Sequence, residues 1–160
     1  MQIILHDIKW RDPFSILTAI VTKASYAHGS IMQDGVVYDT TVTRGSLGIA
    51  KPLNTQGKRE VTIIDLPDID AKAWYDENAG KKYDMIGLIF FPLNVHTKDK
   101  WYCFEACSAC LRENGVEINP DSLPTDGDMI LDYFSSGKYT GRCNITRLCS
   151  RDVELSEFMK

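Results

Sequence analysis

Cys103 combines a nucleophilic side chain with a position in the chain that would activate it. The segment from Lys100 to Leu111 predicts a helix that begins near Cys103. At a helix start, unpaired backbone N–H groups and the positive end of the helix dipole lower the pKa of a thiol and favour the reactive thiolate. The same N–H groups can stabilise an oxyanion. We therefore take Cys103 as a candidate nucleophile.

His28 is a candidate base for this thiol, because a hairpin places it beside a carboxylate. Asp34-Gly35 between two β-rich runs predicts a two-residue turn in which Gln33 opposes Val36. Side chains two positions apart share a face of a strand. This register therefore makes His28 and Asp39 diagonal neighbours, roughly 7–8 Å apart at the backbone. A carboxylate there can orient the imidazole and stabilise its protonated form.

Cys107 and Cys110 follow Cys103 on the same side of the expected helix. Thiols inside a helix usually behave as small buried hydrophobes. The spacing also matches the C-x3-C-x2-C pattern of radical-SAM iron–sulfur sites, but three thiolates on one regular helix do not converge easily on a cluster. Zinc has a similar weakness, because no well-spaced Cys or His pair completes a tetrahedral site. We expect no metal and no cofactor, and surface or core roles for His6 and His96.

Composition and charge limit the classes of function. The chain has 160 residues, of which 44% are hydrophobic and 25% charged, as in an ordinary single globular domain over residues 1–160. The formal net charge of −4 argues against DNA or RNA as a partner, because nucleic-acid binding usually needs a basic surface.

The sequence also gives expectations about location. No apolar stretch approaches the ~20 residues of a transmembrane helix. The N-terminus lacks the basic start and cleavage site of a signal peptide. The five cysteines, three of them crowded together, are a poor disulfide framework. We therefore expect a cytoplasmic protein with reduced thiols.

The elements that must position these side chains follow from hydrophobic periodicity and turn signals. Strands are expected at 2–5, 26–33, 36–41 and 59–66, and helices after Asp12-Pro13, after Asp68 or Asp70, over 101–113 and from about 125 to 134. Residues 42–57 are rich in Gly, Pro and Asn and predict a long surface loop, and the tail with Cys143 and Cys149 is a loop or a late strand. This order predicts an α+β fold with a small antiparallel sheet.

Three blocks of the sequence together resemble the circularly permuted NlpC-like papain-fold cysteine hydrolases. Residues 12–28 are similar to the family's opening helix and histidine-bearing strand, and residues 34–39 to its turn and next strand. Tyr-Asp-x-x-Gly at 83–87 and Cys-x-Glu at 103–105 are similar to its two helix starts. As in permuted members, the histidine precedes the cysteine.

The resemblance implies a half-barrel sheet packed against helices and a Cys103, His28 and Asp39 triad. It implies a thiol-dependent hydrolase or acyltransferase that acts on an amide or thioester bond, with peptide, lipid-acyl or peptidoglycan-like substrates. Tyr26 is a candidate oxyanion donor beside the N–H of Cys103. Two alternatives stay open: a non-catalytic viral or bacterial accessory binding protein with a papain-like frame, and a redox-active thiol protein.

Overall fold

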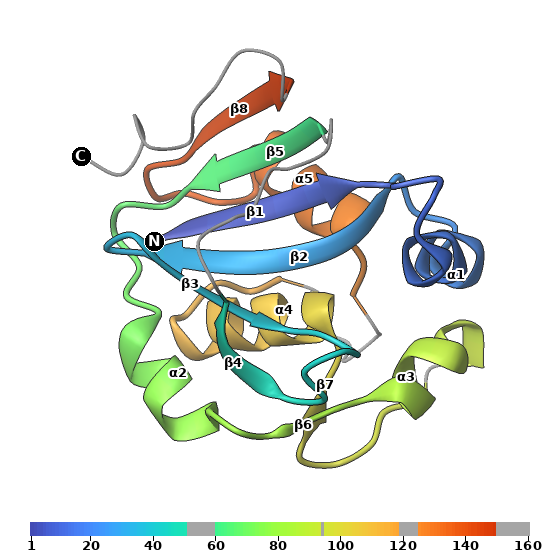
Figure 1. Ribbon diagram of the computed structural model, residues 1–160. Coiled ribbons are helices and arrows are strands. Elements are labelled where there is room, and N and C mark those ends of the chain that lie inside the picture. Colours follow the sequence, from blue (N-terminus) through green and yellow to red (C-terminus); the bar gives the residue numbers. More distant parts are fainter. Residues whose placement is uncertain (51–59, 94, 119–124, 150–160) are drawn as a thin grey trace.

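The computed structural model describes residues 1–50, 60–93, 95–118 and 125–149 (Figure 1). Its main feature is a six-stranded antiparallel sheet in the order β4-β3-β2-β1-β5-β8. The strands are β1 (Gln2–Asp7), β2 (Tyr26–Gln33), β3 (Val36–Thr40), β4 (Leu47–Ala50), β5 (Glu60–Asp65) and β8 (Asn144–Cys149). The expected α+β class is therefore confirmed at the level of an antiparallel sheet packed against helices.

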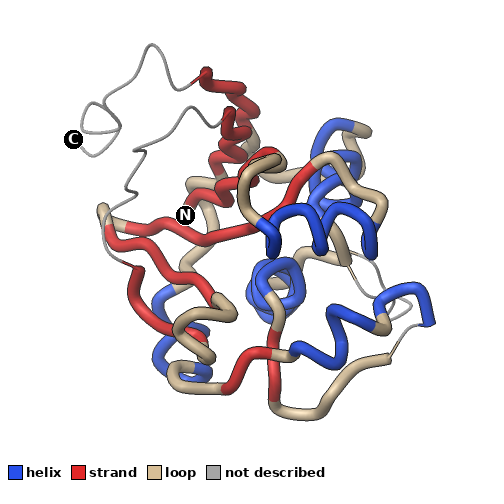
Figure 2. The backbone as a smooth tube through the Cα atoms, turned by 45° about the vertical axis from the view of Figure 1, so that its right-hand side comes forward, coloured by secondary structure: helices blue, strands red, loops and turns tan. Residues whose placement is uncertain are grey.

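Five α-helices and one 3-10 helix connect the strands of the described chain. They are α1 (Pro13–Thr22), α2 (Lys72–Asn78), α3 (Met85–Ile89), η1 (Phe91–Leu93), α4 (Cys103–Glu113) and α5 (Gly127–Ser135). A short parallel pair, β6 (Lys82–Tyr83) and β7 (Lys100–Trp101), lies on the side of α4 away from β1, as Figure 2 shows from a second direction. No helix among the described residues has both the length and the apolar character needed to cross a bilayer.

The helix α4 is the centre of the main core. The sheet curves around it, with β3 and β4 bending down past its side (Figure 1). Every residue from Cys103 to Leu111 is buried. Ile3 and Leu5 of β1 and Ile31 of β2 belong to the same buried cluster as the apolar side chains of α4. A helix enclosed on all sides holds its first residue firmly, because a shift would disturb packing along its whole length.

The hairpin of β2 and β3 has the register predicted from its turn. Gln33 pairs with Val36, and the ladder continues to the pair Ile31 and Tyr38. Asp34 and Gly35 have φ angles of 52° and 74°, the left-handed conformation that a tight two-residue hairpin turn requires at both central positions.

One segment differs from its expected structure, and a second segment decides between two structures that the sequence left open. Residues 47–50 were expected in a loop but form β4, which pairs with β3 from Val37 to Thr40. Residues 42–46 of that expected loop lie outside any helix or strand, and residues 51–57 lie outside the described residues. The tail, for which both a loop and a strand were open, forms β8 against β5.

Candidate active site

A cleft of about 340 Å³ opens between β2, β3, α1 and the first residue of α4. Its walls are mostly polar or small side chains, with a few apolar ones. They are His6, Asp12, Phe14, Ser15, Thr18, Ala27, His28, Ser30, Val37, Asp39, Thr40, Thr41, Val42, Thr43, Tyr83, Leu88 and Cys103. The cleft therefore brings together Cys103, His28 and Asp39, the three residues predicted to form a triad.

Cys103 is the first residue of α4, as the sequence predicted, and it is only 3% exposed. The helix begins here because Tyr102, the residue before it, is fixed at two points. The Glu105 carboxylate accepts a hydrogen bond from the Tyr102 backbone N–H at 3.3 Å, and the Tyr102 hydroxyl donates to the Thr125 carbonyl at 2.8 Å. The amides of the first helical turn have no carbonyl partner within the helix, so they create a positive field around the thiol.

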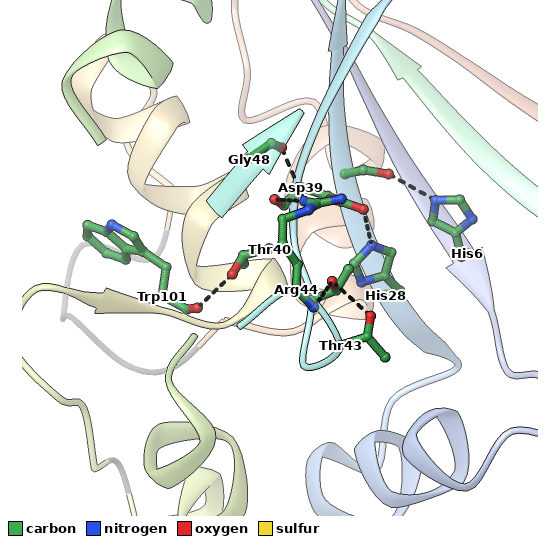
Figure 3. A network of polar contacts seen from close by, with 10 residues as sticks. His6, His28, Asp39, Thr40, Thr43, Arg44, Gly48 and Trp101 are labelled. Carbon is green, nitrogen blue, oxygen red and sulfur yellow. Dashed lines mark hydrogen bonds and ion pairs between the residues drawn. The ribbon is translucent and has the colours of Figure 1, made fainter. Parts of the chain in front are cut away.

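His28 and Asp39 face each other where β2 and β3 separate. The backbone pairing of the two strands ends at Ile31 and Tyr38, and beyond it the two side chains bridge the strands. His28 Nε2 lies 3.3 Å from Asp39 Oδ2 (Figure 3). The His28 side chain is 22% exposed and the Asp39 side chain 11%. The diagonal pairing predicted from the hairpin therefore gives a direct hydrogen bond.

The contacts around His28 and Asp39 shift the pKa values of these two residues in opposite directions. Burial lowers the pKa of His28, but the interactions of its ring with Asp39 and Cys103 outweigh burial and raise the pKa to about 9. Burial raises the pKa of Asp39, but His28 and Arg44 outweigh burial and hold that pKa below its ordinary value. At neutral pH the arrangement therefore favours a protonated imidazole beside an ionised Asp39 carboxylate.

Arg44 is a functional candidate that the sequence analysis did not identify. Its guanidinium donates to the Asp39 carboxylate and also to the backbone carbonyls of Asp39, at 2.9 Å, and Gly48, at 3.3 Å (Figure 3). A basic residue five positions after Asp39 was visible in the sequence. It was overlooked because its surroundings were interpreted as a surface loop, whereas β4 returns beside β3 and brings Gly48 to the arginine.

His6 is a second wall residue that looked isolated in the sequence. It pairs with His28 across β1 and β2, with the ring centroids 5.3 Å apart. Its Nε2 lies 2.9 Å from Ser30 Oγ, and the residue is buried. Only the pairing of β1 with β2 brings the two imidazoles together, and their separation in the sequence gives no sign of it.

Tyr26, the expected oxyanion donor, does not line the cleft. The β1–β2 register shifts between His6 and Asp7, so that Asp7 pairs with Tyr26. The Tyr26 hydroxyl lies 2.9 Å from Thr62 Oγ1 of β5, and the residue is 4% exposed. A tyrosine held there by a buried hydrogen bond is not positioned to stabilise an oxyanion at Cys103.

Tyr83 does line the cleft together with Cys103. Burial raises the pKa of its phenol, and the negative charge of a Cys103 thiolate raises it further. The phenol therefore stays protonated and can donate a hydrogen bond. The sequence analysis recognised Tyr83 only as the first residue of the Tyr-Asp-x-x-Gly motif.

Cys107 and Cys110 are core residues, in agreement with the sequence analysis. They are 1% and 0% exposed. Burial raises the pKa of Cys107 well above its ordinary value and that of Cys110 to about 12. Both thiols stay protonated and poorly reactive at neutral pH.

Comparisons of the chain with family models, with curated proteins and with solved structures find no match. The function must therefore be inferred from the geometry of the side chains in the cleft.

Proposed function

We propose that this chain is a thiol-dependent hydrolase or acyltransferase, built on a circularly permuted papain-like (NlpC-type) fold. The observation that carries the proposal is the position of His28. Its ring is hydrogen-bonded to the Asp39 carboxylate and lines the same cleft as the Cys103 thiol. A cysteine at a helix start, beside a histidine that a carboxylate orients, is the arrangement that activates a thiol for nucleophilic attack.

The first chemical step uses the ion pair of Cys103 and His28. Because Asp39 occupies Nε2 of His28, Nδ1 is the nitrogen that remains for the thiol. With a pKa of about 9, the His28 imidazole is basic enough to take the thiol proton in this step. The thiolate attacks a carbonyl carbon, and the C–O π electrons move to oxygen. When the tetrahedral intermediate collapses, His28 gives its proton to the departing amine or thiol, and a thioester with Cys103 remains.

The second step releases the acyl group. His28, now neutral, removes a proton from water or from another acceptor, which attacks the thioester carbonyl. The Cys103 sulfur leaves as the thiolate and the His28 imidazolium is restored. Water gives hydrolysis, and an amine, alcohol or thiol acceptor gives acyl transfer.

Two groups are suited to hold the oxyanion in both steps. The first-turn N–H groups of α4 are next to the Cys103 sulfur and have no partner within the helix. The Tyr83 phenol, which lines the same cleft, supplies a second donor in the role expected of Tyr26. Donors fixed in advance stabilise developing charge without reorganising during the reaction.

The substrate class remains broad in this proposal: a peptide, a lipid-acyl group or a peptidoglycan-like amide. The net charge of −4 favours none of these over the others, but it disfavours nucleic acid. A cytoplasmic location with reduced thiols belongs to the same proposal, which is supported by the free thiols of Cys103, Cys107, Cys110 and Cys143.

The proposal is tested by comparing the thiols of one protein. We expect iodoacetamide at pH 7 to alkylate Cys103 at least about ten times faster than Cys107 or Cys110, measured by mass spectrometry of peptides. A Cys143→Ser background removes the exposed thiol of Cys143. His28→Ala should lower the Cys103 rate toward that of an ordinary thiol.

The second arm of the test measures acyl chemistry directly. A panel of acyl and peptidyl electrophilic probes should label the wild type and the Cys107→Ala control, but not Cys103→Ala. Equal, slow alkylation of Cys103, Cys107 and Cys110 with no probe labelling would reject the enzyme and favour a binding protein with a papain-like frame.

A further inference from the structure

A second group of ionisable side chains lies near the start of α4, apart from the residues that line the cleft. It consists of Asp84, which caps α3, His96, which precedes β7, and Glu105, in the first turn of α4. One donor atom from each lies within 4.8 Å of the others. None of the three lines the cleft that holds Cys103.

The two carboxyl groups are buried and face the same imidazole. Asp84 is 0% exposed and the Glu105 side chain 9%, and the group they share is His96. His96 Nδ1 lies 2.8 Å from Glu105 Oε1 and 4.0 Å from Asp84 Oδ2. Two buried carboxylates around one imidazole form a compact donor set, and a divalent cation bound among them would compensate their negative charge.

Backbone amides fix both carboxylates in place. Asp84 accepts hydrogen bonds from the N–H groups of Gly87 and Thr97, each at 2.8 Å, and Glu105 accepts one from Tyr102. Metal-binding carboxylates are commonly held by such outer hydrogen bonds, which orient their remaining lone pairs toward the ion. Here the amides hold the carboxylates while one oxygen of each stays near His96 Nδ1.

The donor set selects the class of ion. One imidazole nitrogen with two carboxylate oxygens suits zinc and other first-row divalent metals, whereas magnesium and calcium prefer oxygen donors alone. The His96 side chain is 46% exposed, so an ion can reach the group from solvent.

We propose that Asp84, His96 and Glu105 bind one divalent transition-metal ion, with zinc preferred over magnesium or calcium, and with water as the fourth ligand. Typical zinc bond lengths require the donor atoms to lie roughly 3 to 3.5 Å apart, so the His96 ring must move slightly toward Asp84.

The bound ion would have a structural effect close to the proposed nucleophile. It would join the start of α3, the segment before β7 and the first turn of α4. Glu105 lies two positions after Cys103 and already caps the amide of Tyr102. Occupancy would therefore fix the helix start that carries the thiol, without adding a ligand to the cleft.

Cobalt(II) absorption distinguishes this site from metal binding at the cleft, where Cys103, His28 and Asp39 are also possible ligands. Metal-free protein carrying Cys103→Ser and Cys143→Ser is titrated with Co²⁺ and then with Zn²⁺. We expect one Co²⁺ per chain, visible d–d bands, no thiolate-to-cobalt charge-transfer band, displacement by Zn²⁺ and no displacement by equimolar Mg²⁺ or Ca²⁺. Because Cys103 is absent, this result is independent of the proposed enzyme activity.

Variants of the three ligands decide the location. His96→Gln changes a half-exposed side chain and should fold normally; we expect at least a tenfold loss of affinity. Glu105→Gln keeps an oxygen for the Tyr102 amide, removes the charge and should give a comparable loss, with His28→Gln as the unaffected control. Absence of Co²⁺ binding up to millimolar concentration, or full binding by a correctly folded His96→Gln, would overturn the proposal.

Discussion

Arg44 and His28 hold the two oxygens of one carboxylate: Oδ1 of Asp39 accepts from Arg44, and Oδ2 contacts His28. Asp39 is therefore restrained from both sides, and its orientation does not depend on the histidine alone. A carboxylate fixed in this way keeps the imidazole oriented throughout a reaction cycle, including when the ring is neutral.

Removal of Arg44 should loosen this restraint. In Arg44→Ala we expect the pKa of Asp39 to rise, because burial already raises it and one of the two opposing cations is lost. The free energy of unfolding should fall by about 1 to 2 kcal/mol at pH 7. The loss should shrink as pH falls through the pKa of Asp39, since a carboxylate with a lowered pKa stabilises the fold only while ionised. Urea unfolding of wild type and Arg44→Ala from pH 3 to 7 measures this difference in stability.

Arg142 provides the matched control for this variant. It forms an arginine–aspartate pair with Asp68, but both side chains are largely exposed to water. Solvent and salt screen such a pair, so Arg142→Ala should change neither stability nor Cys103 alkylation appreciably. Equal effects of the two substitutions would contradict a special role for Arg44.

The raised pKa of His28 predicts a loss of stability at alkaline pH. A histidine with a folded-state pKa of about 9 and an ordinary value of 6.5 stabilises the fold fully below pH 6.5. That contribution, up to roughly 3 kcal/mol, disappears as pH rises through 9. Denaturant unfolding of wild type and His28→Gln from pH 6 to 9.5 should give curves that converge at the alkaline end. The pKa values of the buried Cys107 and Cys110 thiols are also raised, so their ionisation lowers the stability of both proteins at alkaline pH. The quantity to compare is therefore the difference in unfolding free energy between wild type and His28→Gln.

Gly29 sets the distance between β2 and α4. A Cβ atom at this position would lie 2.9 Å from Phe104 Cδ1 and 3.2 Å from Cys107 Sγ. We expect Gly29→Ala to lower the free energy of unfolding by about 1 to 3 kcal/mol. The same displacement of α4 should slow Cys103 alkylation. Adding Phe104→Leu should recover part of the stability, whereas strictly additive losses in this double-mutant cycle would show that the contact is not the cause.

The two tyrosines near the site give opposite expectations. Tyr83→Phe should lower acyl turnover by about 10- to 100-fold, as expected for loss of an oxyanion donor, while iodoacetamide alkylation of Cys103 changes little. Tyr26→Phe removes the hydrogen bond to Thr62 and should cost about 1 kcal/mol of stability with turnover unchanged. Turnover that responds to Tyr26→Phe and ignores Tyr83→Phe would reverse the assignment.

Local rules were sufficient for part of the site. The Asp34-Gly35 turn has a conformation that fixes the hairpin register, and this placed Asp39 beside His28. Asn114 and Gly115 marked the end of α4, and its start at Cys103 followed from the periodicity before them. Such features depend on residues close in sequence, so patterns a few residues long determine them.

The contacts of the site that were not predicted from the sequence depend on pairing between distant segments. The contact of His6 with His28 requires β1 to pair with β2, and the contact of Arg44 with Gly48 requires β4 to return beside β3. Tyr26 was expected beside Cys103 but lies elsewhere, because the β1–β2 register is irregular at this point and no local sequence signal marks the irregularity. The group of Asp84, His96 and Glu105 joins three elements, and the sequence analysis considered His96 in isolation.

His28 and Asp39 lie in the hairpin of residues 26–40 and Arg44 follows it closely, whereas Cys103 lies 75 positions after His28. Contacts within the hairpin close short loops and form at low entropic cost, and they involve segments that leave the ribosome first. Cys103 reaches the cleft only when α4 is enclosed by the sheet. Under the proposed function, an incomplete or unfolded chain therefore carries an ordinary cysteine, and the order of assembly delays activation of the thiol until the molecule is finished.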